Sequence, residues 1–313
     1  MSYAFTFPGQ GSQAVMMGKE LADQFAEARL VFEEIDEALG QSLSNIMWAG
    51  PEDTLTLTEN AQPALMAVSM AVMRVLESKG FCLADQAAYV AGHSLGEYAA
   101  LAAAGTFSLS DTARLLKTRG QAMQQAVPVG EGSMAALLGL DFATVTDIAS
   151  HAAGADEVCS AANDNAPGQV VVSGSKAAVE RACELAKEAG AKRAMPLPVS
   201  APFHCSLMAP AAERMAVALS EVEMSPPVVP LVANVTAAPT SDPNVIRDQL
   251  VQQVTGVVRW SESVTWLGDN GVTHLVEVGS GKVLSGLARR INKELGATAL
   301  NTGADIDAFL ETI

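Results

Sequence analysis

The stretch AAYVAGHSLGEYAALAAA, residues 87–104, decides the fold class of this chain. Its first five residues, Ala87–Ala91, form a short apolar run that is typical of a buried strand. The alanine-rich run Leu95–Ala104 favours a helix, because alanine has the highest helix propensity. Between the two runs lies GHSLG, residues 92–96, whose glycines permit a sharp turn. A strand, a tight turn and a helix form the unit of a parallel sheet, so the sequence predicts an α/β fold.

The same alternation of strands and helices continues on both sides of this unit. Apolar patterns predict further strands at Tyr3–Phe7, Leu231–Asn234 and His274–Val278. Apolar residues at helical spacing predict helices at Leu21–Leu39, Ala64–Leu76 and Lys282–Leu295. We therefore expect one α/β domain that is formed by residues 1–127 and 198–313.

Residues 128–197 have a different pattern, which starts at Pro128 and ends before Pro198. They predict, in order, a strand, a helix, two strands, a helix and a strand, at Ser133–Leu140, Phe142–Ala152, Val158–Ala162, Gln169–Ser173, Lys176–Ala189 and Ala191–Leu197. This β-α-β-β-α-β order is that of a ferredoxin-like unit. We expect the segment to be a small domain inserted into the larger one.

The composition excludes several classes of function. The chain has 313 residues with 19 basic and 35 acidic side chains, a formal net charge of −16. Such a surface repels phosphate backbones, so we expect no nucleic-acid partner. No apolar run approaches the roughly 20 residues of a membrane-spanning helix, and the first basic residue, Lys19, comes too late for an export signal. We expect a soluble, cytoplasmic protein that binds no membrane.

The cysteines give no sign of a metal site. The chain has four of them, Cys82, Cys159, Cys183 and Cys205, and no two form a C-x-x-C pair. A structural metal site needs several ligands at short, regular spacing. We therefore expect reduced thiols and no bound metal.

Ser94 is the candidate nucleophile. It is the central residue of a G-x-S-x-G pentapeptide between a predicted strand and a predicted helix, the context in which this motif lifts a serine hydroxyl above a sheet. The N–H groups at the start of the helix could then bind an oxyanion. The alternative interpretation is a glycine-rich turn whose serine caps the helix.

A serine nucleophile needs a base, and the chain has four histidines. His93 belongs to the turn itself and is expected to point elsewhere, and His151 ends a surface helix. His204 ends the irregular apolar segment PVSAPFH, residues 198–204, where no helix or strand explains it, so we favour it. His274 is the competitor, since it follows an aspartate in the Ser-Asp-His order of α/β-hydrolases. We interpret His274 as an ordinary residue of the predicted strand rather than as the base.

Arg119 is a cation on the apolar face of a helix. From Ser110 onward the spacing predicts a helix in which Leu115, Leu116, Arg119 and Met123 share one face. Such an arginine must find an anion, because an unpaired buried charge costs several kcal/mol. The anion could be a substrate carboxylate bound by two hydrogen bonds, or an aspartate or glutamate in a structural ion pair. Spacing alone leaves both interpretations open.

Two glycine-rich loops resemble nucleotide-binding motifs but fail the test of context. Residues 7–14, FPGQGSQA, match G-x-G-x-x-A, but the acidic residues about 20 positions later lie in a helical pattern rather than at the end of a second strand. We interpret this loop as a second oxyanion donor. Residues 279–283, GSGKV, lack the upstream glycine and the Ser or Thr after the lysine of a P-loop.

Six motifs, taken together, resemble one enzyme family along nearly the whole chain. They are FPGQGSQ (7–13), GHSLGE (92–97), TRG (118–120), NAPGQV (165–170), APFH (201–204) and EVG (277–279). In this order they closely resemble the malonyl-CoA:acyl-carrier-protein transacylases of type II fatty acid synthesis. The resemblance implies a hydrolase-like large domain with a parallel sheet and a nucleophile elbow, plus an inserted ferredoxin-like small domain.

The resemblance also implies the main chemical roles. Ser94 would accept the malonyl group from malonyl-CoA as an ester, with His204 as the base. The backbone N–H groups of Gln10 and Leu95 would form the oxyanion hole, and Arg119 would bind the malonyl carboxylate. The malonyl group would then pass from the ester to the phosphopantetheine thiol of acyl carrier protein, which frees the serine. No bound cofactor is implied, and we expect a monomer.

Other residues are implied to support or line the site. The backbone carbonyl of Gln253 would orient the histidine, and Asn163, Asn165, Met123 and Phe203 would line the cavity. A bulky ring at Phe203 leaves little room for a 2-methyl branch, so we expect malonyl to be preferred over methylmalonyl. The sequence departs from the family at residues 256–260, GVVRW, where valine replaces the usual proline before Val-x-Trp. We therefore expect a less rigid loop after Gln253.

The charge of the chain complicates this assignment. Carrier proteins are acidic, as is this chain, so a local basic patch must promote their encounter. The candidates are Lys192, Arg193, Lys282, Arg289 and Arg290.

The candidate site residues disfavour two alternative functions, a serine hydrolase and a scaffold. A serine hydrolase would use the same turn but transfer the acyl group to water, and Arg119 disfavours a hydrolase of neutral esters. A scaffold without turnover is disfavoured because it would have no need of Ser94, His204 and Arg119 together.

Overall fold

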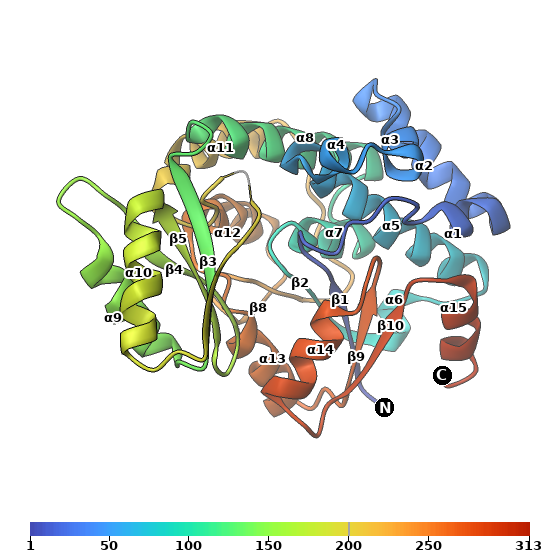
Figure 1. Ribbon diagram of the computed structural model, residues 1–313. Helices are drawn as coiled ribbons and strands as arrows, with labels where there is room; N and C mark the ends of the chain where they lie inside the picture. The colour runs from blue at the N-terminus through green and yellow to red at the C-terminus, as the bar shows by residue number, and fades with distance from the viewer. Residues whose placement is uncertain (200) are drawn as a thin grey trace.

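Two β-sheets organise the computed structural model, which describes residues 1–199 and 201–313. The larger sheet has six strands in the order β10-β9-β1-β2-β7-β8, and the smaller one has four in the order β4-β5-β3-β6. Figure 1 shows the smaller sheet, with helices α9 and α10 on its outer side, standing beside the larger one. Ser200, within the irregular segment 198–204, lies outside the described residues.

The larger sheet is parallel except at one edge. Its strands are β1 (Tyr3–Phe7), β2 (Ala87–Gly92), β7 (Leu231–Val232), β8 (Pro239–Thr240), β9 (His274–Val278) and β10 (Gly296–Leu300). β1 pairs in parallel with both β2 and β9, and only β8 runs antiparallel to its neighbour. All five residues of β1 are buried, as expected for a central strand of a sheet covered on both faces. The predicted α/β fold class is thereby confirmed.

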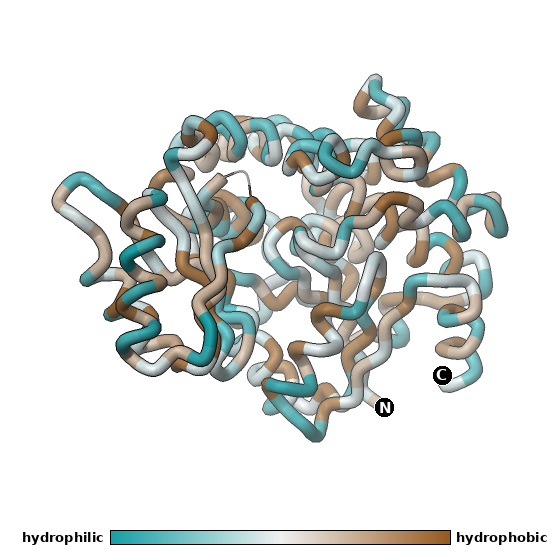
Figure 2. The backbone as a smooth tube through the Cα atoms, viewed as in Figure 1, coloured by the Kyte–Doolittle hydropathy of each residue, from teal (hydrophilic) through white to brown (hydrophobic). Residues whose placement is uncertain are grey.

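Helices cover both faces of this sheet. They are α1 (Lys19–Gln24), α2 (Ala26–Leu39), α3 (Leu43–Ala49), α4 (Glu52–Thr56), α5 (Thr58–Ser78), α6 (Leu83–Gln86), α7 (Gly96–Ala103), α8 (Leu109–Ala126), α11 (Ala209–Ser220), α12 (Pro243–Thr255), α13 (Trp260–Asp269), α14 (Val283–Ile291) and α15 (Gly303–Leu310), with the 3-10 helix η1 (Ser206–Met208). In Figure 2 many peripheral helices alternate between teal and brown along the chain, as expected when one helix face packs on the core.

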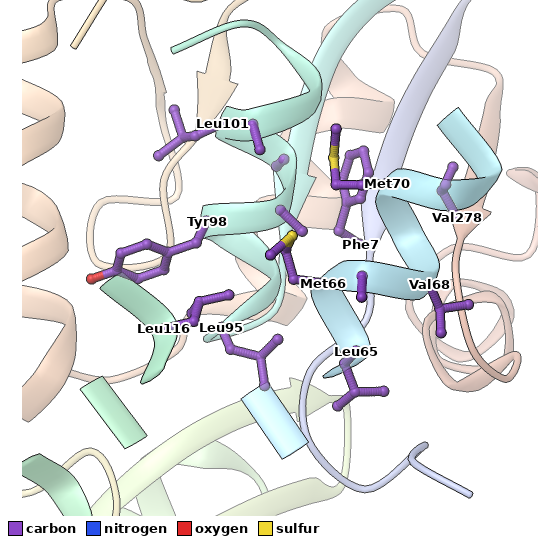
Figure 3. Packing of buried hydrophobic residues seen from close by; sticks show 14 of the residues in the cluster. Phe7, Leu65, Met66, Val68, Met70, Leu95, Tyr98, Leu101, Leu116 and Val278 are labelled. Carbon is purple, nitrogen blue, oxygen red and sulfur yellow. The ribbon is translucent and has the colours of Figure 1, made fainter. Parts of the chain in front are cut away.

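The main hydrophobic core lies between the sheet and helices α2, α5, α7 and α8. Figure 3 shows side chains of α5 gathered with Phe7 of β1 and with Tyr98 and Leu101 of α7. Phe7, Tyr98 and Leu101 are fully buried. On the opposite face, Ala4 of β1 packs in a second cluster with residues of α13 and α14. Because α5 and α7 are fixed against β1, the turn between β2 and α7 has a rigid base.

The smaller sheet is antiparallel and has its own core. It contains β3 (Gly132–Leu138), β4 (Cys159–Ala166), β5 (Gln169–Ser175) and β6 (Arg193–Pro196), covered by α9 (Phe142–Ala152) and α10 (Lys176–Glu188). The order β3-α9-β4-β5-α10-β6 is that of a ferredoxin-like unit. Two backbone hydrogen bonds join β4 to Val258, a residue of the larger unit: the N–H of Asp164 donates to Val258, and the N–H of Val258 donates to Ala162. The domain boundaries 1–127, 128–197 and 198–313 stay a prediction.

Several predicted elements differ from those observed. The helix predicted over Leu21–Leu39 is two helices, because Phe25 is extended with φ −124° and ψ 124°. The helix predicted to start at Ala64 begins at Thr58 and includes Pro63. The helix predicted over Lys282–Leu295 ends at Ile291. Strand β10, which was not predicted, follows at Gly296. The strand predicted over Leu231–Asn234 ends at Val232.

Candidate active site

Ser94 lies at the tip of a strained turn where β2 ends and α7 begins. Its φ is 53°, a left-handed conformation that non-glycine residues rarely adopt. A Cβ atom on Gly92 would lie 1.9 Å from the carbonyl carbon of Gly96. A Cβ atom on Gly96 would lie 2.1 Å from the carbonyl oxygen of Phe7. Both positions therefore accept only glycine, and the turn directs the hydroxyl of Ser94 outward, as the G-x-S-x-G interpretation predicts.

His204 is the histidine that contacts Ser94. Its Nε2 lies 2.8 Å from the Oγ of Ser94, and its Nδ1 lies 2.8 Å from the carbonyl oxygen of Gln253. A carbonyl can only accept, so Nδ1 carries the proton and donates to Gln253. Nε2 is then free to accept the hydroxyl proton of Ser94. The arrangement is a serine–histidine dyad in which a backbone carbonyl takes the place of an acidic third residue.

Burial keeps this histidine neutral. His204 is only 4% exposed, and burial together with the nearby charge of Arg119 lowers the pKa of His204 to about 3. A base must be unprotonated to accept a proton, so His204 is ready to act at neutral pH. Among the described residues, the side chains of the other three histidines have different hydrogen-bond partners: His93 binds Asn165, His151 binds the backbone of its own helix and His274 binds Thr298.

Arg119 reaches the nucleophile from α8. Its Nη2 donates to Ser94 Oγ at 3.2 Å and to Gln253 Oε1 at 2.8 Å, and its Nη1 donates to Gln62 Oε1 at 2.7 Å. The side chain is 1% exposed, and no carboxylate of the described residues forms an ion pair with it. Its partners are neutral amides and a hydroxyl. The guanidinium is therefore a buried cation whose charge no adjacent anion balances.

The predicted site residues converge on one cavity. A hollow of about 570 Å³ is lined by the candidate catalytic residues and by Gln10, Leu95, Met123, Asn163, Asn165 and Phe203. Gln253 is not one of the lining residues. It is fully buried next to them and contacts both His204 and Arg119. The lining residues Gln10, His93 and Ser94 follow the carboxyl ends of β1 and β2, the edge at which α/β sheets bind ligands.

The expected oxyanion donors lie on two sides of Ser94. Leu95 is the N-cap of α7, and Gln10 is in the loop after β1. Among the described residues, no hydrogen bond of the backbone N–H of either residue is seen. The side chain of Gln10 accepts a hydrogen bond from Thr58 at 2.9 Å, which secures its loop to α5. Both N–H groups are thus available to a developing negative charge.

Comparison with known proteins identifies the family. A family model described as acyl transferase domain matches residues 4–294. The chain belongs to this acyl transferase family. A curated relative from Salmonella typhimurium, named malonyl CoA-acyl carrier protein transacylase, is 47% identical over 308 residues, which cover 98% of each chain. The family resemblance expected from the six motifs is confirmed.

Two solved structures of the family are similar to this chain throughout. An acyl-carrier-protein S-malonyltransferase from Bartonella henselae is 59% identical, with a TM-score of 0.98 over 100% of this chain and 99% of that one. A malonyl-transacylase in complex with a type II PKS acyl-carrier protein is 42% identical, with a TM-score of 0.96 over 100% of both chains. The predicted two-domain α/β fold is confirmed by these similarities.

Nothing in the described chain indicates a metal or a membrane. Residues 1–199 and 201–313 contain no cluster of three or more histidine, cysteine, aspartate or glutamate side chains that could bind a metal ion. No helix in the same residues has the length and apolar composition needed to cross a membrane.

Sequence reasoning missed three buried polar residues of this acyl transferase site: Gln62, Asn234 and Glu97. Gln62 accepts from Arg119, but it precedes the predicted start of its helix. Asn234 was assigned to a strand, although it follows the end of β7. Glu97 is the last residue of the GHSLGE motif, and nothing in the sequence indicated a separate role for it. Gln62 lies in the polar stretch TENAQP, residues 58–63, before the predicted apolar helix, and the sequence held no specific signal for any of the three.

Two hydrogen bonds from the side chain of Asn234 stabilise the turn that carries Ser94. Its Oδ1 accepts the backbone N–H of Ser94 at 2.8 Å, and its Nδ2 donates to the carbonyl oxygen of Gly92 at 2.6 Å. The residue is 1% exposed, so water cannot replace these bonds. One side chain therefore secures both the strained residue and the glycine before it.

We expect Asn234→Ala to slow acylation of Ser94 by about 10- to 100-fold, because a small displacement of a nucleophile has effects of this size. The measurement is the single-turnover rate of ester formation, with circular dichroism to confirm folding. Asn244→Ala, an asparagine in the first turn of α12, is the matched control. A wild-type rate in Asn234→Ala would show that the turn does not need this residue.

Proposed function

We propose that this chain transfers the malonyl group from malonyl-CoA to the phosphopantetheine thiol of acyl carrier protein, through a malonyl ester of Ser94. One observation carries the proposal: a buried arginine without an acidic partner lies 3.2 Å from the candidate nucleophile. A site that transfers a neutral acyl group has no use for such a cation. An acyl group that ends in a carboxylate supplies the missing negative charge.

The first half of the reaction would form the ester. The Oγ of Ser94 attacks the thioester carbonyl while Nε2 of His204 accepts the hydroxyl proton. The negative charge that develops on the carbonyl oxygen is stabilised by the N–H groups of Gln10 and Leu95. Collapse of the tetrahedral intermediate breaks the carbon–sulfur bond, and the protonated histidine returns its proton to the departing coenzyme A thiolate.

The second half would reverse these roles with a different thiol. The phosphopantetheine thiol of the carrier protein gives its proton to His204 and attacks the ester carbonyl. Breakdown of the second intermediate returns the proton to Ser94 and releases the malonyl carrier protein. Gln253 supports both halves, because its carbonyl oxygen fixes the protonation of Nδ1 while Nε2 exchanges protons.

Arg119 would orient the acyl group in both halves. Its Nη2 contacts Ser94 and Gln253, and its Nη1 contacts Gln62, so the guanidinium plane is fixed before substrate arrives. A carboxylate can replace the contact with Ser94 and bind the plane through two parallel hydrogen bonds. This binding places the thioester carbonyl, on the other side of the malonyl methylene, next to the nucleophile.

We expect brief mixing with malonyl-CoA to add one malonyl group to Ser94, detected by intact-protein mass. Ser94→Ala should give no adduct, and Arg119→Ala should lower the adduct yield at least about 10-fold, because charged hydrogen bonds contribute about 1.5–3 kcal/mol. The same tubes are assayed for free malonate and for discharge of the adduct by carrier-protein thiol. Free malonate without an adduct would indicate a hydrolase, and neither product would support a scaffold.

The wall of the cavity favours an unbranched acyl group. Phe203 is 9% exposed and lines the cavity beside His204. We expect malonyl-CoA to acylate Ser94 about 10- to 200-fold faster than methylmalonyl-CoA, the range that one methyl group produces in a closed pocket. Phe203→Ala should reduce this ratio. Single-turnover rates with each thioester measure it, and equal rates in the wild-type protein would contradict a selective role for the ring.

Two exposed basic residues, Arg290 and Lys192, lie at the end of the smaller sheet where Gln169 pairs with Leu138. Arg290 of α14 donates to Gln169 of β5 at 2.8 Å, and Lys192 packs against Gly139, which is hydrogen bonded to Gly168. The candidate docking residues are Lys192, Arg193, Lys282, Arg289 and Arg290, all exposed and without ion pairs to described residues. We propose that the acidic carrier protein docks there.

We expect the double charge reversal Arg289→Glu, Arg290→Glu to slow discharge of the malonyl enzyme by carrier protein at least about 10-fold, because docking would meet repulsion instead of attraction. Acylation by malonyl-CoA should change much less. The two half-reactions are measured separately, and Arg214→Glu on α11 is the control. Unchanged discharge would exclude Arg289 and Arg290 from the docking surface.

The proposed setting is the cytoplasm. All four cysteines are free, and free thiols are typical of proteins in reducing compartments. We propose that the chain works there as a monomer on a separate carrier protein.

A further inference from the structure

Glu97 is a buried carboxyl group that the proposed reaction does not use. It belongs to the first turn of α7, three residues after the nucleophile, and is 1% exposed. Its Oε2 accepts a hydrogen bond from Nε2 of Gln253 at 2.6 Å. Burying a carboxyl group is costly, and a position this close to the nucleophile calls for a functional explanation.

The amide of Gln253 connects Glu97 to Arg119. Its Oε1 accepts from Nη2 of Arg119 at 2.8 Å, while its Nε2 donates to Glu97 and also to the carbonyl oxygen of Ser94 at 2.9 Å. A flipped amide would point its oxygen at two acceptors and its N–H groups at the guanidinium donors. The two acceptors, the carboxyl group of Glu97 and the carbonyl oxygen of Ser94, therefore orient the amide so that its oxygen faces Arg119.

We propose that Glu97 is a positioning residue for the acyl carboxylate: through the amide of Gln253 it fixes Arg119 beside Ser94. This inference rests on the proposed function, because it assigns Glu97 a role in binding the malonyl carboxylate. The hydrogen-bond chain has two links, and each of its three side chains is at most 1% exposed. Water therefore cannot substitute for a missing member of the chain.

The protonation state of Glu97 determines what Arg119 can bind. Burial raises the pKa of Glu97 to about 8, although the bond from Gln253, the backbone of Asn234 and the charge of Arg119 all act to lower it. Arg119 comes from α8, and the other titratable group at Glu97 is Tyr98 of the same helix. The neighbouring β1, β2 and α5 bury no lysine, arginine, aspartate or glutamate among the described residues.

A neutral Glu97 leaves the charge of Arg119 for the substrate. Below pH 8 the carboxyl group keeps its proton, so one cation and one malonyl carboxylate form a balanced pair in the buried site. Above pH 8 Glu97 becomes a second anion two hydrogen bonds from the same arginine. Two buried anions cannot both be balanced by one cation, so the affinity for malonyl-CoA should fall as the pH rises.

The stability of the protein should depend on pH for the same reason. The pKa of Glu97 is about 8 in the folded protein and about 4.5 for a free side chain. Between these two values the folded state binds a proton that the unfolded state has lost. The free energy of unfolding should therefore decrease as the pH rises from about 4.5 to about 8. Replacement of Glu97 by a neutral residue removes this contribution.

The test compares the wild-type protein with Glu97→Gln from pH 6 to 9.5. Single-turnover ester formation from malonyl-CoA, without carrier protein, gives the dissociation constant and the acylation rate separately, and avoids titration of the acceptor thiol. For the wild-type protein we expect the dissociation constant to rise up to 10-fold per pH unit above pH 8. For Glu97→Gln we expect the rise to be absent, and Glu27→Gln on α2 should behave as wild type.

Two further measurements separate positioning from a general structural role. Thermal unfolding of both proteins at pH 5 and pH 8 should show that Glu97→Gln gains stability relative to wild type as the pH rises. Glu97→Ala removes the partner of Gln253 and should weaken malonyl-CoA binding at every pH. If Glu97→Ala does not fold, Glu97→Gln alone decides the result.

The possible outcomes are distinct. Wild-type binding of malonyl-CoA by a folded Glu97→Ala, or the same pH dependence of ester formation in wild type and Glu97→Gln, would overturn the inference about Glu97 and leave the proposed function intact. Wild-type protein that forms no malonyl ester at any pH would overturn the proposed function and the role of Glu97 with it.

Discussion

The close approach of three backbone segments at Ser94 is the constraint on which the rest of the structure depends. A single methyl group on Gly92 or Gly96 would overlap backbone atoms of Gly96 or Phe7. The carboxyl end of β1, the turn and the first residues of α7 are therefore held at contact distance. This brings the loop with Gln10 beside the nucleophile, and it gives Ser94 its left-handed conformation. Asn234 completes the turn from a third strand end.

A buried cation that forms no ion pair with a described carboxylate determines the electrostatics around this turn. Arg119 is bound by the amide oxygens of Gln62 and Gln253, which orient the guanidinium but do not neutralise it. Its charge adds to burial in lowering the pKa of His204, so the base is neutral. It acts in the opposite sense on Glu97, where burial prevails and raises the pKa to about 8. One cation thus connects the base, the acyl-binding site and the buried carboxyl group.

Several features could be predicted because they depend on local chemistry. The G-x-S-x-G turn between a strand and a helix was visible at residues 87–104, and the structure has both elements there. The helix over Phe142–Ala152 was predicted with its observed bounds. Other elements were missed because their patterns are ambiguous. The apolar residues through Leu295 continue a helical pattern, and only the pairing of Gly296–Leu300 with β9 makes the following residues a strand.

The sequence by itself determined the α/β class, the turn at Ser94 and the family, because each follows from adjacent residues or from the order of short motifs. Residue spacing alone favoured His204 over His274 as the base and left the anion bound by Arg119 open, and the family resemblance then implied His204 and the malonyl carboxylate. Only the tertiary structure decided which side chains meet at Ser94, since these contacts join residues far apart in the chain. Ser94 and His204 are 110 positions apart, and Arg119 and Gln253 are 134 apart. Local patterns carry no information about which distant side chains burial will bring together.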